Sequence, residues 1–331
     1  MRPDVRESGD AYRIRRLMGQ DAAAFSGFEQ RMSAGGGHKN LDDPEQLLAL
    51  NESGALISAV AVDGAHRIVG YSALTRPGLE RIAESGESMV LPELNGLDLV
   101  ERMGGLLERE ALSAGLLGLS YHAAVDDEVR QKLYERSGCQ ATGIMFEGLP
   151  APAKEGCAPW LLYFKYLVPP PRALVSIQGR HQPMIERIYQ GLGREIEWAE
   201  NYSPLRPGQL DATYLPDLRQ GLIQIREAGY RTADAAAQSC TSLCDLSDAA
   251  VVSLELPVGQ PQAAQVCGEL EQRGFAFAAI KPGDGGDFLV MQFLAAPPAA
   301  PTSKIQNEFA RELVAYVAGE IRRVHPGAGG S

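Results

Sequence analysis

The chain has 331 residues, of which 31 are Lys or Arg and 42 are Asp or Glu, so its formal net charge is −11. This acidic composition argues against nucleic acid or an anionic membrane surface as a partner, because both attract basic surfaces. No apolar run reaches the roughly 18 residues that span a bilayer, and the first residues lack the apolar core of a signal peptide. At about 150 residues per domain, the length predicts two domains in a soluble cytoplasmic protein.

The cysteines and histidines are scattered along the chain. An odd number of cysteines without paired spacing is typical of reduced, cytosolic thiols. Cys240 and Cys244 lie four residues apart and would share a helix face, which is half of a metal site, but no second pair of ligands lies near them in the sequence. We therefore expect ordinary packing at these cysteines and no bound metal.

Clusters of proline divide the chain. The prolines at 169–171 lie between two apolar runs, and because proline donates no ladder hydrogen bond they predict a stiff connector. The predicted organisation is an N-terminal domain at 1–168, a linker at 169–172 and a C-terminal domain at 173–324. The glycine-rich end, 325–331, predicts a disordered tail.

Hydrophobic periodicity before the linker predicts strands and helices in alternation. The expected elements are a strand at 11–17, a helix at 21–32, a short helix at 44–52, a two-stranded hairpin within 55–76, a strand at 87–94, a helix at 97–115, a strand at 116–125, a helix at 127–138, and strands at 139–150 and 159–168. This order predicts an α/β layout with a mixed sheet.

The second half repeats this order in a weaker form. The expected elements are a strand at 173–179, a helix at 181–193, strands at 194–200, 212–218 and 219–229, a helix at 231–246, a strand at 249–257, a helix at 261–274, and strands at 275–282 and 287–295, before a last helix. The shared order of element types predicts a duplicated fold.

Two stretches of the first half resemble motifs of the GNAT superfamily of acyl-CoA-dependent N-acyltransferases, as does the order of elements across 11–168. SMVLPELNGLDLVERMGGLLEREA is similar to that family's strand, pyrophosphate loop and helix, and DDEVRQKLYERSGCQATGI is similar to its helix-then-strand signature. The resemblance implies two tandem acyltransferase-like domains, each a mixed, mostly antiparallel sheet flanked by helices, with a degenerate second half.

The resemblance also implies where an acyl-CoA would bind. In that fold, amides at a helix start wrap the pyrophosphate, which the helix dipole favours, and strand backbone such as that of Met89 and Leu91 pairs with the pantetheine arm. Asn95 stands where the family has Arg or Gln, and Asp98 stands at its second glycine, where a carboxylate would either repel phosphate or cap the helix. The matching positions are Met89, Val90, Leu91, Asn95, Gly96, Leu97, Asp98 and Leu99.

Amine acylation needs a base that takes a proton from the ammonium and an acid that gives one to the leaving thiolate. By resemblance, Tyr134 is the candidate acid, and Glu84 and Glu87 are candidates for the base. Each also has a plainer interpretation, because Tyr134 could pack one helix face and the glutamates could simply be solvated. His122 is either a titrating group beside the acyl channel or a hydrogen-bonded sheet residue.

The second half offers fewer candidates. The equivalent of the phosphate loop, at 223–238, holds Gly229 but no glycine pair, so we expect no CoA site there. The glycine-rich stretch 281–290 predicts a hairpin turn. His181 and its neighbours on the expected helix at 181–193 are expected to be solvated or packing positions.

These observations together predict an N-acyltransferase with acetyl-CoA or another acyl-CoA as donor. The acceptor would be a small amine, an amino acid or a peptide amine. An acyl-carrier protein as donor is less favoured, because such carriers are typically acidic like this chain. Two alternatives stay open: a noncatalytic ligand-binding or regulatory protein with a decayed acyl-CoA site, and the same fold used for different chemistry.

Overall fold

The computed structural model describes residues 12–33, 44–76, 78, 80–94, 96–148, 157–200, 206–296 and 304–325. By its contacts the chain divides into two compact units, residues 1–120 and 121–331. This division falls inside strand β5, and the boundary predicted at 169–172 is a different division that stays a prediction. Of the predicted tail only His325 is among the described residues. Within the described ranges no helix is long and apolar enough to cross a membrane.

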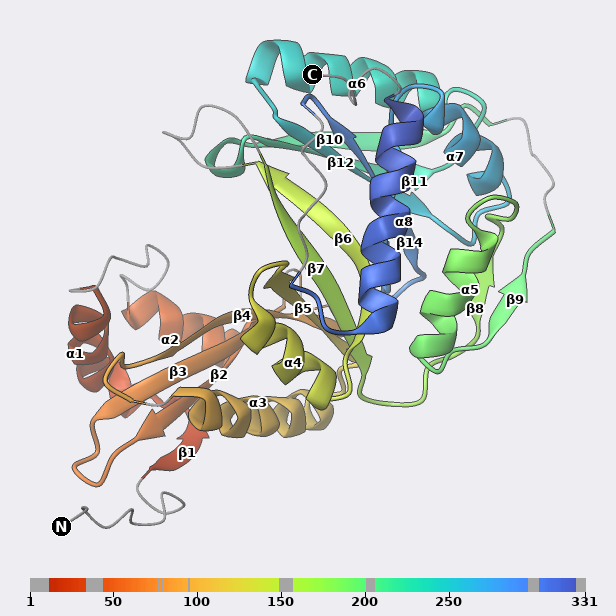
Figure 1. The fold of residues 1–331 in the computed structure, drawn as a ribbon. Coiled ribbons are helices and arrows are strands. Elements are labelled where there is room, and N and C mark those ends of the chain that lie inside the picture. The colour runs from red at the N-terminus through yellow and green to blue at the C-terminus, as the bar shows by residue number, and fades with distance from the viewer. Residues whose placement is uncertain are drawn as a thin grey trace. The chain divides into compact units, whose positions relative to one another are not determined.

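Unit 1 is built on antiparallel strands in the order β1-β2-β3-β4, and β5 joins β4 in parallel (Figure 1). Its elements are β1 (Arg13–Arg16), η1 (Gly19–Asp21), α1 (Ala22–Ser33), α2 (Pro44–Ser53), β2 (Leu56–Val62), β3 (Ile68–Thr75), β4 (Ile82–Val90), α3 (Gly96–Ser113) and the start of β5 (Gly118–Ala124). The predicted order of elements in this part of the chain is confirmed, with β4 beginning earlier than the strand predicted at 87–94.

The central strands of unit 1 are buried and mostly apolar because helices cover both faces. Every residue of β2 is buried, and α1 and α2 lie on one face of the sheet while α3 lies on the other (Figure 1). A strand covered on both faces has no solvent side on which polar residues would alternate. This explains why the hairpin within 55–76 is a nearly continuous apolar run.

A buried ion pair holds the entrance to α1. The guanidinium of Arg15 donates two hydrogen bonds to the carboxylate of Asp21, at 2.6 and 2.7 Å, and that carboxylate also accepts from the Met18 amide at 2.8 Å. Asp21 is 4% exposed. Burial alone would raise the pKa of Asp21, but the hydrogen bonds from Arg15 and Met18 outweigh it and lower that pKa. Asp21, the last residue of η1, is therefore linked to Arg15 of β1.

The Asp21 pair predicts an acid-dependent loss of stability. A carboxyl whose folded pKa lies below the unfolded value of about 3.9 stabilises the fold above that value and loses this contribution as pH falls through the folded pKa. Asp21→Asn should cost about 1.5–3 kcal/mol at neutral pH, and the difference from wild type should shrink in acid. Thermal unfolding across pH would measure this; Glu52→Gln, at an exposed position on α2, is the control, and a pH-independent difference would contradict the assignment.

Unit 2 contains a longer sheet, in the order β5-β7-β6-β13-β14-β12-β11-β10, and a small parallel pair, β8-β9. Its elements after β5 are α4 (Glu128–Arg136), β6 (Gln140–Gly148), β7 (Cys157–Tyr166), β8 (Ala173–Val175), α5 (Gln182–Gly191), β9 (Ile196–Trp198), β10 (Gln209–Leu215), η3 (Pro216–Leu218), β11 (Gln220–Glu227), α6 (Thr232–Ser247), β12 (Val251–Pro257), α7 (Ala263–Glu271), β13 (Ala276–Lys281), β14 (Phe288–Leu294) and α8 (Glu308–Val324). The predicted fold class, a mixed and mostly antiparallel sheet flanked by helices, is confirmed.

One pattern of strand neighbours occurs twice. The order β4-β5-β7-β6 has its counterpart in β11-β12-β14-β13. In each set the first two strands are parallel, and one helix connects them, α3 in the first and α6 in the second. The next helix, α4 or α7, then leads to the last strand of the set. This repetition supports the tandem organisation, which stays a prediction.

A second buried ion pair closes the hairpin between β13 and β14. Arg194 and Asp287 have side chains that are 7% and 1% exposed, with Nη1 2.6 Å from Oδ2. The Asp287 carboxylate also accepts a hydrogen bond from the Tyr189 hydroxyl at 2.6 Å. Arg194 further donates to the Pro171 carbonyl at 2.8 Å and to the Tyr166 hydroxyl at 2.6 Å. The predicted proline linker is thus bonded to unit 2 through the Pro171 carbonyl, and the guanidinium of Arg172 also pairs with Glu195 at 2.8 Å.

Removing one partner of this pair should be strongly destabilising. Asp287→Ala leaves the buried guanidinium of Arg194 without its counter-charge, which typically costs about 3–5 kcal/mol of unfolding free energy. Urea unfolding followed by circular dichroism would measure the loss. Asp284→Ala, in the same turn but exposed, should change stability by about 0.5 kcal/mol or less. Equal effects of the two substitutions would show that the buried pair has no special role.

Candidate active site

In unit 1, β4 is paired along one edge and released from its neighbour along most of the other. Its antiparallel pairing with β3 extends from Glu84 to Val90. Its parallel pairing with β5, in the part of the chain that the structure describes, covers only Ile82, Ala83 and Glu84. From Ser85 onward this edge of β4 is therefore available for main-chain hydrogen bonds to an extended ligand, as in added-strand recognition.

A β-bulge lies where the two strands part. Leu74 of β3 pairs with Ser85, and Ser72 pairs with Ser88, so Gly86 and Glu87 together face the single residue Ala73. A side chain at Gly86 would lie close to the β3 backbone, since an added Cβ would be 3.3 Å from the Ala73 carbonyl oxygen. A bulge bends its strand and increases the local twist, which suits the separation of β4 from β5.

The two predicted base residues lie on either side of this change in pairing. Glu84 is half-buried, is the last residue of β4 paired with β5, and has a carbonyl that accepts from the Thr75 hydroxyl at 3.3 Å. Glu87 lies within the bulge, and its side chain is outside the described part of the structure. The backbone thus places both residues at the released edge, and their catalytic roles stay predictions.

The segment predicted to bind pantetheine, residues 89–91, could contact a ligand mainly through its backbone. The side chains of Met89 and Leu91 are buried in the core, and Val90 is half-buried. The Leu91 amide donates to the Val69 carbonyl at 3.0 Å, and the Leu94 amide donates to the Leu91 carbonyl at 3.0 Å, which forms the turn toward α3. Recognition here would depend on backbone geometry, so side-chain identity carries little signal in the sequence.

The helix that follows begins earlier than predicted. α3 starts at Gly96, so Asp98 lies in its first turn and does not occupy the capping position that the sequence allowed. Its carboxylate is exposed and lies 3.5 Å from Nη1 of Arg102, one turn further along. Leu97 is exposed, Leu99 is buried, and Asn95 lies outside the described residues. A negative charge therefore stands on an exposed helix N-terminus, partly balanced by Arg102.

The predicted acid, Tyr134, belongs to unit 2. It lies on α4, and its ring packs against Tyr121 of β5, with centroids 4.8 Å apart, and against Tyr163 of β7, at 5.8 Å. Tyr134 is half-buried in this aromatic group, and His122, beside Tyr121, is half-buried as well. The ring of Tyr134 is thus a packing element, and these contacts do not involve its hydroxyl group. Its action together with Glu84 or Glu87, which belong to unit 1, stays a prediction.

The equivalent loop of the second half has its amides already bonded. The Tyr230 and Arg231 amides donate to the carbonyls of Arg206 and Pro207, at 3.0 and 3.2 Å. The Gly229 amide donates to the Thr232 hydroxyl at 2.8 Å. Gly229 is required for this close approach, because an added Cβ would lie 2.3 Å from the Arg206 carbonyl oxygen. The segment before β10 therefore already accepts hydrogen bonds from these amides, and the expectation of no CoA site here stays a prediction.

An open cavity of about 940 Å³ lies beside the same helix, between β10 and α6. Its carboxylates, Asp211 and Asp234, are each paired with an arginine, Arg226 and Arg273 respectively. No predicted site residue lines it. Both carboxylates of the cavity are thus paired with arginine side chains, and its lining also includes apolar residues such as Leu210 and Ala235.

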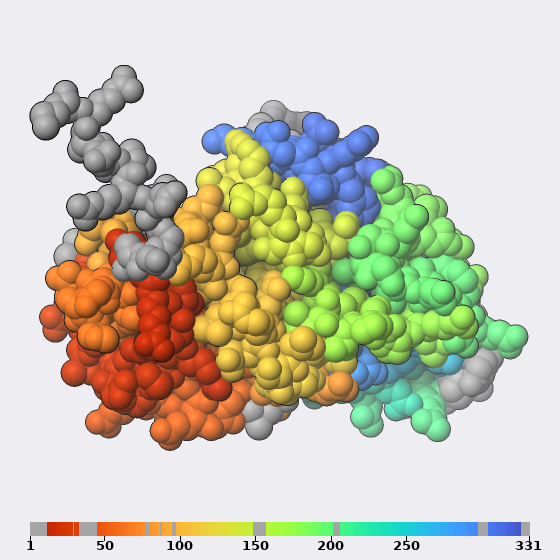
Figure 2. Space-filling view, turned by 90° about the horizontal axis from the view of Figure 1, so that it is seen from below, coloured from red at the N-terminus to blue at the C-terminus, as the bar shows by residue number. Residues whose placement is uncertain are grey.

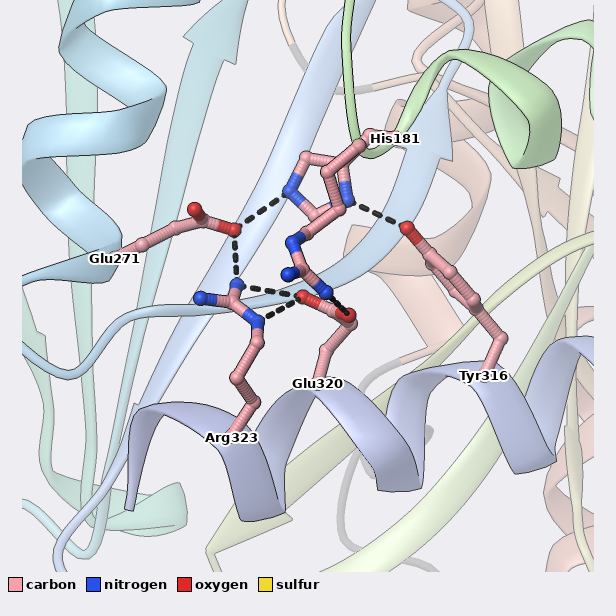
Figure 3. A network of polar contacts seen from close by, with 6 residues as sticks. His181, Glu271, Tyr316, Glu320 and Arg323 are labelled. Carbon is pink, nitrogen blue, oxygen red and sulfur yellow. Dashed lines mark hydrogen bonds and ion pairs between the residues drawn. The ribbon is translucent and has the colours of Figure 1, made fainter. Parts of the chain in front are cut away.

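A buried polar network in unit 2 was not predicted from the sequence (Figure 3). His181 is 3% exposed and lies between two partners: Nε2 is 2.7 Å from Oε1 of Glu271, and Nδ1 is 2.6 Å from the Tyr316 hydroxyl. Arg323 bonds both Glu271 and Glu320. Burial would raise the pKa of Glu271, but the hydrogen bond from His181 and the charge of Arg323 outweigh it and lower that pKa.

His181 is therefore not solvated; it is buried, as the packing alternative expected, and its ring nitrogens also contact Glu271 and Tyr316. His181 precedes Glu271 by 90 residues in the chain, so no local spacing indicated their contact. The one available signal is the spacing of Cys267 and Glu271, four residues apart on α7. Among the described residues, one group of at least three His, Cys, Asp or Glu side chains has all its potential metal-ligand atoms within 4.8 Å of one another. It consists of His181, Cys267 and Glu271.

Comparison with known proteins finds likeness only at the level of solved structures. No protein-family model matches the sequence, and no curated protein matches it. A ribosomal-protein-S5-alanine acetyltransferase from Vibrio fischeri is 17% identical, with a TM-score of 0.41 over 49% of this chain and 97% of that chain. An acetyltransferase of the GNAT family from Streptococcus pneumoniae is 19% identical, with a TM-score of 0.39 over 47% and 99%.

A third match, yncA from Salmonella typhimurium, was solved with its cofactor acetyl-CoA; it is 18% identical, with a TM-score of 0.39 over 48% of this chain and 95% of that chain. About half of this chain is similar to GNAT acetyltransferases. The likeness is remote, and what those proteins bind or modify does not by itself assign a substrate to this one.

Proposed function

We propose that the chain is an N-acyltransferase of the GNAT type, with an acyl-CoA as donor and an amine as acceptor. The observation that carries this proposal is the released edge of β4, with its bulge at Gly86 and Glu87, followed by the first turn of α3, where Leu97 and Asp98 are exposed. An extended thioester arm needs main-chain partners, and a pyrophosphate needs helix amides. Both are provided along one continuous segment of unit 1.

Two kinds of residue would then carry out the proton transfers, a glutamate as the base and a tyrosine as the acid. Glu84 or Glu87 would take a proton from the acceptor ammonium, which makes the amine nucleophilic toward the thioester carbonyl. The hydroxyl of Tyr134 would return a proton to the departing thiolate. Neither step requires a metal. The acceptor class, whether a small amine, an amino acid or a peptide amine, follows from the chemistry of amide formation alone.

The first test is binding of CoA to the wild-type chain by calorimetry. A saturable heat at micromolar to millimolar CoA supports the proposal, and absence of both heat and thermal shift would overturn it in favour of a noncatalytic protein with a decayed site. Asp98 is the observation that favours this alternative, because its exposed carboxylate lies in the first turn of α3, where we propose that the pyrophosphate binds.

Removing this carboxylate should strengthen CoA binding. A charge in the first turn of a helix is worth about 0.3–1 kcal/mol, so Asp98→Asn should tighten the Kd for CoA about two- to fivefold. Glu108→Gln removes the same charge from the fourth turn of α3 and should leave the Kd nearly unchanged. Equal tightening by both variants would mean that only the net charge of the chain matters and that Asp98 does not face the phosphate.

Tyr134 can be tested apart from binding. Tyr134→Phe keeps the ring contacts with Tyr121 and Tyr163 and removes only the hydroxyl, so the fold and the Kd for CoA should persist. Loss of a general acid should lower kcat about 10²–10⁴-fold in an acetyl-CoA assay with small amines, amino acids and peptides as acceptors. Tyr121→Phe, in the same aromatic group, is the matched control. Unchanged kcat in Tyr134→Phe would leave Tyr134 a packing residue.

A further inference from the structure

We propose that His181, Cys267 and Glu271 form a binding site for a single divalent metal ion of the zinc type. The three side chains offer a nitrogen, a sulfur and an oxygen that all lie within 4.8 Å of one another. Four-coordinate zinc has donor atoms about 3.3–3.8 Å apart, as its bond lengths of about 2.0–2.3 Å require. Side-chain adjustments of about 1 Å would therefore close the three donors around one ion.

The secondary structure presents these donors to one point. Cys267 and Glu271 lie one turn apart at the end of α7, so they share a helix face. His181 is the N-terminal capping residue of α5, and its ring approaches the end of α7 (Figure 3). In the space-filling view atoms of α5, in green, and of α8, in blue, reach the surface of the molecule (Figure 2). His181 and Cys267 are each 3% exposed.

Two of the three proposed ligands, Glu271 and Cys267, each have an atom without a hydrogen-bond partner among the described residues. Oε1 of Glu271 bonds His181 and Arg323, and within the described part of the chain its other oxygen, Oε2, has no hydrogen-bond partner (Figure 3). The Cys267 thiol, buried and on the same helix face, likewise makes no hydrogen bond among the described residues. A metal ion would engage these two atoms without first breaking a bond to either.

The surroundings of His181 are those of a metal ligand. A ligating imidazole normally bonds a second partner through its other ring nitrogen, which fixes the ring and its tautomer. Here Nδ1 is 2.6 Å from the Tyr316 hydroxyl, which leaves Nε2 as the atom directed at Glu271. Arg323, bonded to both Glu271 and Glu320, holds the carboxylate in place.

The charges balance when the ion enters. The Cys267 thiol loses its proton to solvent. Nε2 of His181 exchanges its hydrogen bond to Glu271 for the metal and carries no proton in the complex, so the one proton of the neutral imidazole lies on Nδ1, which donates it to the Tyr316 oxygen. One thiolate and one carboxylate then neutralise the two positive charges of the ion. Arg180 and Arg323 remain beside Glu320, to which both are paired. The mixture of nitrogen, sulfur and oxygen donors favours zinc, with a fourth position left for water.

Cobalt(II) is the probe, because it takes zinc sites and is coloured. The full-length chain, freed of metal with a chelator, should bind one Co²⁺ per molecule with visible bands of a four-coordinate ion and a near-ultraviolet sulfur-to-metal band. Zn²⁺ should displace Co²⁺ and remove the colour, and each ion should raise the Tm. Absence of stoichiometric binding by the wild-type chain would overturn the proposal and leave the cluster a purely structural network.

Two variants distinguish this site from adventitious binding to thiols. Cys267→Ser should lose the sulfur-to-metal band and weaken Co²⁺ binding at least tenfold. Cys240→Ser is the matched control, because Cys240 is another buried cysteine of the same unit, on α6, and it should bind Co²⁺ as wild type does. A band that persists in Cys267→Ser, or that disappears in Cys240→Ser, would place the metal elsewhere and contradict the assignment.

Discussion

One parallel pair of strands in a mostly antiparallel sheet sets the position of the candidate active site. Parallel strands cannot be joined by a hairpin, so β4 and β5 need a crossover, and α3 provides it. The crossover helix must start where β4 ends. Its N-terminus, with the positive end of the helix dipole, is therefore always beside the last residues of that strand. The bulge at Gly86 and Glu87 then directs those residues away from β5.

Buried charge has a different role in unit 2, where it connects segments distant in sequence. Asp287 accepts bonds from Arg194 and Tyr189, and Arg194 reaches Pro171 of the proline-rich segment. A carboxylate this deep is tolerated only because several donors surround it. Asp21 and Asp287, the two deeply buried aspartates that we describe, are each matched by a guanidinium.

The sequence predicted elements well and long-range polar contacts poorly, for a physical reason. Periodicity is local, so the apolar run of β2 and the amphipathic α3 and α8 are visible in a short window. The contact of His181 with Glu271 spans 90 residues, and that of Arg194 with Asp287 spans 93. No window contains both partners. The glycines of the turn before Asp287 correctly predicted a hairpin but gave no sign of its buried charge.

The two crossover helices show how duplicated topology can lead to different chemistry. Before α6, Gly229 allows the segment that begins at Arg206 to approach closely. The carbonyls of that segment then accept hydrogen bonds from the amides of Tyr230 and Arg231. The carbonyl groups of Arg206 and Pro207 are held beside these amides by the fold, so a phosphate from solution would have to displace them. In the first turn of α3 the neighbouring feature is the exposed carboxylate of Asp98, paired with Arg102, whose charge is screened by solvent. The α6 loop amides are thus bonded within the chain, which supports our proposal that the pyrophosphate site lies at α3 and not at α6.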